Sequence, residues 1–112
     1  MARRYYKTIR EYESVVVFKP TLTEDEVQKR LQELKELIQR KGGEVLNITD
    51  WGVKQLAYPI QRFNHGRYFI IHVRSQNPQL PNELDFHYKI SEDIIRWLNI
   101  QVKAKEGEKV AQ

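Results

Sequence analysis

A clearly bounded amphipathic helix pattern over residues 23–41 limits the possible folds more than any other part of this sequence. Thr23 is followed three residues later by Glu26, which is the pattern of an N-terminal capping box. Apolar residues then recur at spacings of four, three and four, as one face of a helix requires: Val27, Leu31, Leu34 and Ile38. The pair Gly42-Gly43 can stop the helix in a left-handed conformation. The sequence therefore predicts an amphipathic helix over about 23–41 that needs another layer to cover its apolar face.

Strand-like segments flank this helix. Residues 12–19 are rich in valine and end at Pro20, which cannot donate a ladder hydrogen bond. Residues 44–62 are extended, with Gly52 at a possible bulge or bend. Residues 63–66 read as a turn with Gly66 at positive φ, followed by a strand over 67–74. A second helix over about 81–89 and a last strand over 94–102 complete the order.

The order β-α-β-β-α-β predicts an α+β fold of the ferredoxin-like type. It would hold a four-stranded antiparallel sheet with two helices on one face, leaving the other face available to a partner. In the last strand, we expect the mostly apolar parity of Arg96, Leu98, Ile100 and Val102 to face the core. In the first strand, both parities carry apolar residues, so the sequence leaves its facing open.

Composition narrows the class of protein. The 112 residues suit a single domain, 1–112, with a basic N-terminal arm over 1–10 and a flexible charged tail over 103–112. There is no cysteine, which excludes disulfides, thiolate catalysis and cysteine-based metal sites. No stretch approaches the ~20 apolar residues of a membrane span, and no signal peptide is visible. We therefore expect a protein of the cytoplasm with no membrane partner.

Catalysis finds little support in the residues. The three histidines, His65, His72 and His87, have no neighbours at a metal-ligand spacing, so we interpret them as turn, strand and helix residues. An acylphosphatase, which shares the predicted order, needs a glycine-containing loop and an arginine after the first strand, whereas residues 18–22 hold neither. We expect no enzyme activity, no metal, no cofactor and no small-molecule substrate.

Basic and aromatic residues alternate instead on extended segments, a pattern typical of nucleic-acid binding. The formal net charge is 19 − 15 = +4, and the first ten residues alone account for it. We expect that arm to contact nucleic acid through Arg3, Arg4, Lys7 and Arg10. Trp51 and Tyr68 fit either a base-stacking role or ordinary packing in a strand. The segment 65–72 also has a loose likeness to the aromatic strand of RNA recognition modules.

Four short motifs follow one another along the chain, and their order is informative. Tyr12-Glu13 leads into the valine strand, Gly42-Gly43 follows the helix, residues 51–60 read W-G-V-K-Q-L-A-Y-P-I, and Gly66-Arg67-Tyr68-Phe69 comes next. From about Arg10 to Lys103 the chain resembles the family of bacterial small-subunit ribosomal protein six. The segment 51–60 is the most specific part of this resemblance.

The resemblance implies a ferredoxin-like, ribosome-bound protein that helps to assemble the platform of the small ribosomal subunit. It implies binding to the central domain of small-subunit rRNA as a heterodimer with small-subunit ribosomal protein eighteen. The positions at which the family contacts rRNA hold Arg10, Tyr12, Lys54, Gln55, Tyr58, Arg62 and Arg96. The family's C-terminal extension runs along the partner protein, which implies contacts from Lys103, Lys105 and Val110.

Two alternatives use the same fold. One is a homodimeric ligand-sensing or interaction module that pairs through the open sheet face. The other is an acyl phosphate hydrolase, which the missing arginine disfavours. A dimer that forms without RNA would favour the first, and an activity assay would settle the second.

Overall fold

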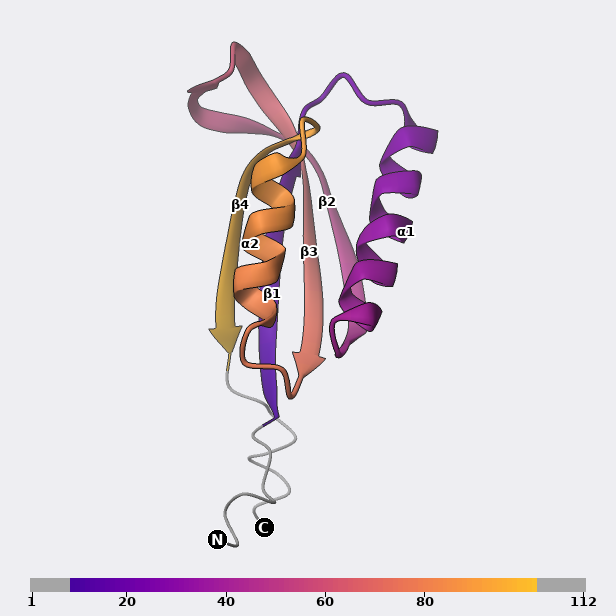
Figure 1. Ribbon diagram of the computed structural model, residues 1–112. Helices are drawn as coiled ribbons and strands as arrows, with labels where there is room; N and C mark the ends of the chain where they lie inside the picture. The colour runs from indigo at the N-terminus through magenta and orange to yellow at the C-terminus, as the bar shows by residue number, and fades with distance from the viewer. Residues whose placement is uncertain (1–8, 103–112) are drawn as a thin grey trace, which may run out of the picture.

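The computed structural model describes residues 9–102, and within them the strands and helices follow the order β-α-β-β-α-β (Figure 1). Four strands form one sheet in the order β2-β3-β1-β4, and neighbouring strands are antiparallel. The ferredoxin-like fold predicted from the sequence is confirmed. The bounds are β1 Arg10–Phe18, α1 Glu24–Arg40, β2 Gly43–Ile60, β3 Phe63–Ser75, α2 Leu80–Ile90 and β4 Ile94–Val102.

Helix α1 begins and ends as its sequence predicts. Thr23 accepts a hydrogen bond from the Glu26 amide, and the Glu26 side chain accepts one from the Thr23 amide, so the capping box is complete. Gly42 follows the helix at φ 87°, a conformation that glycine adopts without strain. The four apolar residues of the predicted stripe are all buried. They pack against the sheet and provide much of the main core.

The facing of β1, which the sequence leaves open, is decided by the helices. Val16 and Phe18 belong to the core under α1 and α2, so their parity faces the helices, and Val15 and Val17 lie on the other face. The buried Ser14 hydroxyl donates to Asn99 Oδ1 at 2.6 Å and shares a 2.6 Å hydrogen bond with the Tyr88 hydroxyl. This network joins β1, α2 and β4 inside the protein and satisfies polar groups that would otherwise be costly to bury.

The predicted facing of the last strand is wrong. β1 pairs Val17 with Arg96 but Phe18 with Ile94, so one residue of β4 is inserted as a bulge. The bulge reverses the parity of the strand that follows it. Trp97 packs on the main core, whereas Leu98 and Ile100 remain 55% and 41% exposed on the opposite face.

The predicted turn at 63–66 is also displaced. The chain reverses at Gln61 and Arg62, whose φ angles are 51° and 73°, and β3 already begins at Phe63. Gly66 therefore lies within a strand and not in a turn. It is required for another reason, because a Cβ at this position would overlap the Val17 side chain beneath it. The predicted bulge at Gly52 is confirmed, with φ 80° and a shift of register between Asp50 and Gly52.

Candidate nucleic-acid interface

The outer part of the β2–β3 hairpin bends away from the rest of the sheet (Figure 1). Its Leu56 packs with Val17 and Ile95 into a second, smaller buried cluster, which we call the hairpin cluster. Three partly buried residues complete this cluster: Ile60, Phe63 and Tyr68. Since Val17 faces away from the helices, the hairpin cluster covers one end of the sheet face that the sequence predicts to be open.

Two cation–aromatic pairs lie next to the hairpin cluster. The Arg96 guanidinium lies 5.9 Å from the centre of the Tyr58 ring, and the Lys54 ammonium lies 5.5 Å from the centre of the Trp51 ring. Tyr58 is 59% exposed and Trp51 is 49% exposed. Cations of this kind neutralise phosphates, and exposed rings stack on bases or pack on sugars. The two pairs therefore give this end of the molecule the chemistry of a nucleic-acid interface.

The predicted contact residues of the hairpin lie together at this end. Gln55 is exposed and pairs with His65 across the hairpin, and Arg62 is exposed at the chain reversal. Within residues 9–102, no acidic side chain forms an ion pair with Lys54, Arg62 or Arg96. Their positive charges are therefore available to a phosphate backbone.

Two other predicted contact residues lie elsewhere. Arg10 pairs with Ser75, seven residues along β1 from Val17, which places it about 23 Å from the partner of Arg96. Tyr12 is only 5% exposed, so its ring offers no free face for stacking. The remaining predicted contacts lie outside the described residues: Arg3, Arg4, Lys7, Lys103, Lys105 and Val110.

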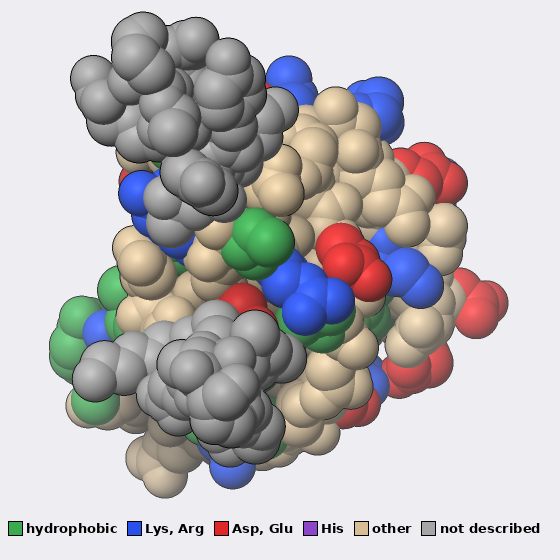
Figure 2. Space-filling view, turned by 90° about the horizontal axis from the view of Figure 1, so that it is seen from below, with side chains coloured by type: hydrophobic (Ala, Val, Ile, Leu, Met, Phe, Trp, Pro, Cys, Tyr) green, Lys and Arg blue, Asp and Glu red, His purple; other side chains and the backbone are tan. Residues whose placement is uncertain are grey.

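At the opposite end of the molecule, charges of both signs are mixed. Figure 2 shows Lys and Arg side chains beside Asp and Glu side chains on this end. Ion pairs account for part of this mixture, with Arg74 at 3.3 Å from Glu44 and Lys41 at 3.1 Å from Glu83. The described part of this end is therefore less suited to a polyanion than the end around the hairpin cluster.

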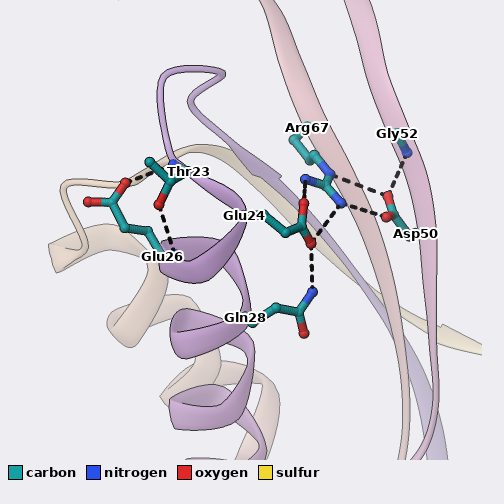
Figure 3. Close-up of polar contacts among 7 residues, drawn as sticks. All are labelled: Thr23, Glu24, Glu26, Gln28, Asp50, Gly52 and Arg67. Atoms are coloured by element: carbon teal, nitrogen blue, oxygen red, sulfur yellow. Dashed lines mark hydrogen bonds and ion pairs between the residues drawn. The ribbon is translucent and has the colours of Figure 1, made fainter.

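A separate ionic network fixes α1 to the sheet (Figure 3). The Arg67 guanidinium on β3 donates to Glu24 at 2.7 Å and to Asp50 at 2.7 Å, and the Gly52 amide also donates to Asp50. These hydrogen bonds from Arg67 lower the pKa values of both carboxyl groups, and they raise the pKa of Arg67 itself. The network connects the first turn of α1 to the bulge that precedes Lys54.

We expect the free energy of unfolding of Arg67→Gln to fall less than that of the wild type as the pH is lowered. Carboxyl groups whose pKa is lowered by folding stabilise the protein above their unfolded pKa, and this contribution is lost as pH falls through the folded value. For Glu24 and Asp50, this stabilisation is therefore lost at pH values below about 4. Urea unfolding between about pH 7 and pH 3 measures it. Lys29→Gln, which removes a charge from the exposed side of α1, should keep the wild-type pH dependence; an equal flattening in both variants would contradict the assignment.

The histidines occupy three separate environments. His72 Nε2 lies 2.8 Å from Oε1 of Glu11, a carboxylate that is buried although nothing in its sequence context indicates burial. His87 is half-buried on α2, and burial lowers its pKa. His65 lies in β3 and not in a turn. Among residues 9–102, no group of three or more potential ligands could hold a metal ion.

The fold and the exposed cation–aromatic pairs give the chain the surface chemistry of a nucleic-acid-binding protein, and comparison with known proteins identifies its family. The family model described as Ribosomal protein S6 matches residues 11–101, so the chain belongs to the ribosomal protein S6 family of the small subunit. This family comprises structural, non-enzymatic ribosomal components, and the resemblance found in the sequence is confirmed. In the described chain, neither helix has the length and apolar character to cross a membrane.

Individual relatives support this assignment. The small ribosomal subunit protein bS6 of Aquifex aeolicus is 58% identical over 109 residues, which cover 97% of this chain and 99% of that protein. The protein of the same name from a Nitratiruptor species is 43% identical over 88% of this chain and 76% of that protein. A crystal structure of 30S ribosomal protein S6 from Thermotoga maritima superposes with a TM-score of 0.83 at 28% identity, over 93% of this chain and 97% of that one.

Proposed function

We propose that this chain binds the central domain of small-subunit rRNA together with small-subunit ribosomal protein eighteen, during assembly of the platform. The observation that carries the RNA contact is the end around the hairpin cluster, where Lys54, Arg62 and Arg96 lie exposed and have no acidic partner within residues 9–102. The exposed Tyr58 ring lies beside Arg96 at the same end. Phosphate contacts by these cations would position the protein on the RNA, and Tyr58 would pack on a sugar or a base. Gln55 adds a neutral hydrogen-bonding group at the same end.

A partner protein is supported by the remaining part of the open sheet face. Leu98 and Ile100 project from β4 on the side away from the helices, next to Val15 of β1. Exposed apolar side chains that adjoin one another on a sheet favour contact with another protein. The arm with Arg3, Arg4, Lys7 and Arg10, and the tail with Lys103, Lys105 and Val110, would add contacts to RNA and to the partner. This function would place the chain on ribosomes in the cytoplasm.

Binding to a central-domain rRNA fragment should be weak for the isolated chain and much tighter when protein eighteen is present. The chain carries a net charge of only +4, so a partner must contribute charge and contact area. With about four phosphate contacts, we expect affinity to fall on the order of a hundredfold between about 50 and 200 mM salt. Filter binding at several salt concentrations measures both effects.

A fragment from another domain of the same rRNA serves as the control and should bind at least tenfold more weakly. Tight, salt-insensitive binding by the isolated chain would contradict the cooperative function. A stable homodimer in sizing chromatography that RNA and protein eighteen leave unchanged would instead favour the interaction module.

A further inference from the structure

Trp51 is held outward by the backbone on which it lies. The register shift between Asp50 and Gly52 inserts an extra residue into β2, and Gly52 takes φ 80° directly after the tryptophan. The Gly52 amide donates to Asp50 Oδ1 at 2.8 Å, which ties the bulge to the Arg67 network. A large apolar ring is thus kept half-exposed by a defined local structure, and not by an irregular loop.

The Trp51 ring packs against the ring of Tyr68 on the neighbouring strand β3. The centres of the Trp51 and Tyr68 rings are 6.4 Å apart, with their planes tilted by 35°. Tyr68 itself packs on the hairpin cluster. Because Tyr68 is held by the hairpin cluster, its contact with Trp51 restricts the Trp51 side chain before any ligand binds. Trp51 would therefore lose little conformational freedom when a ligand stacks on it.

Lys54 supplies a positive charge at the same place. Its ammonium lies 5.5 Å from the centre of the Trp51 ring, close enough for a cation–π contact. An aromatic face next to an exposed cation matches a nucleotide, in which a flat base is connected to a phosphate. The second tryptophan is different, since Trp97 Nε1 donates to Asp85 at 2.7 Å and its ring packs on the main core.

We propose that Trp51 stacks on the base of an unpaired rRNA nucleotide, while Lys54 contacts the adjoining phosphate. This inference rests on the proposed function and deepens it, because it specifies the class of RNA element that is bound. Bases within an A-form helix are stacked on both sides and offer no free face, whereas bulged or single-stranded nucleotides do. The bound element therefore contains at least one unpaired base opposite β2.

Tryptophan fluorescence tests the stacking directly, since the chain has only two tryptophans. A single-stranded RNA of about ten nucleotides should quench the emission of the wild-type protein, because stacking on a base quenches an indole. A blunt duplex of the same sequence should quench it far less. Trp51→Leu should abolish the quenching by the single strand, which assigns the signal to Trp51 and not to Trp97.

Affinity for the central-domain fragment, with protein eighteen present, gives a second readout. Trp51→Leu should weaken binding about tenfold without changing the salt dependence, because it removes a stacked base and no phosphate contact. Trp51→Tyr should keep most of the affinity, since it retains an aromatic face. Val53→Ala, at an exposed neighbouring position, is the matched control and should bind as the wild type does.

Equal affinity of Trp51→Leu and the wild type, together with no quenching by the single strand, would overturn the stacking site and leave the proposed function standing. Weaker binding of Trp51→Leu to protein eighteen in the absence of RNA would also overturn it, because Trp51 would then be a protein contact. Failure of the wild-type protein to bind the rRNA fragment even with protein eighteen would overturn the proposed function as well.

Discussion

Replacing Lys54 and Arg96 together by alanine is expected to weaken binding of the rRNA fragment, in the presence of protein eighteen, by about a hundredfold. Each cation lies exposed beside an aromatic ring and without an acidic partner among the described residues. A hydrogen bond to a charged group contributes about 1.5 to 3 kcal/mol, so the loss of two such contacts amounts to roughly two orders of magnitude or more. Filter binding across a salt series measures the loss.

The salt dependence separates a lost contact from a lost net charge. Removing two phosphate contacts should reduce the slope of log affinity against log salt by about 1.5. The matched control is Lys29→Ala with Lys35→Ala, which removes the same charge from α1, on the helical side of the sheet. This control should keep nearly the wild-type affinity and slope. If the two double variants lost affinity equally, the assignment of the interface to the hairpin end would be wrong.

Truncating Leu56 to alanine is expected to weaken RNA binding although the side chain touches no RNA. Leu56 is the buried residue by which the hairpin packs on Val17 and Ile95. Its loss leaves a cavity under β2 and costs about 2 kcal/mol in the free energy of unfolding, the low end of the range because the hairpin cluster is small. The segment that carries Lys54 and Tyr58 then loses its anchor, and we expect a roughly tenfold lower affinity for the fragment.

Leu34→Ala provides the comparison for this effect. Leu34 is a buried residue of α1 in the main core, so its truncation should lower the free energy of unfolding by about 3 kcal/mol or more. The folded fraction should nevertheless bind RNA as the wild type does, because the hairpin cluster is intact. Urea unfolding gives both stabilities, and binding is measured at a temperature where both variants are folded. A larger loss of affinity in Leu34→Ala than in Leu56→Ala would show that binding follows overall stability and not the hairpin anchor.

Local sequence patterns predicted the elements well because each depends on neighbouring residues. The capping box of Thr23 and Glu26, the stop at Gly42 and the bulge at Gly52 all occur as predicted. The last strand has the predicted bounds, 94–102. The errors fall where a distant strand decides the outcome. Gly66 belongs to a strand, where its close approach to Val17 and not a turn requires a glycine. The facing of β4 changes because the bulge against β1 inserts a residue.

The candidate interface shows the same division between local and distant effects. Lys54 and Arg62 are basic residues of an extended segment, and the sequence by itself indicates their chemistry. The burial of Tyr12 does not follow from its neighbours, since both parities of β1 offer apolar residues and only packing on the helices chooses between them. Likewise, the contact between Tyr58 and Arg96 joins segments that are remote in sequence.

By itself, the sequence determined the family, the order of the elements and the kinds of side chain that could bind RNA, since these depend on residue identity and on spacing along the chain. Only the tertiary structure decided which face of each strand is covered and which basic residues lie together. The hairpin cluster is the physical reason: by burying Leu56 against Val17 and Ile95, it brings the two cation–aromatic pairs to one end of the sheet. The same packing leaves Arg10 at the other end.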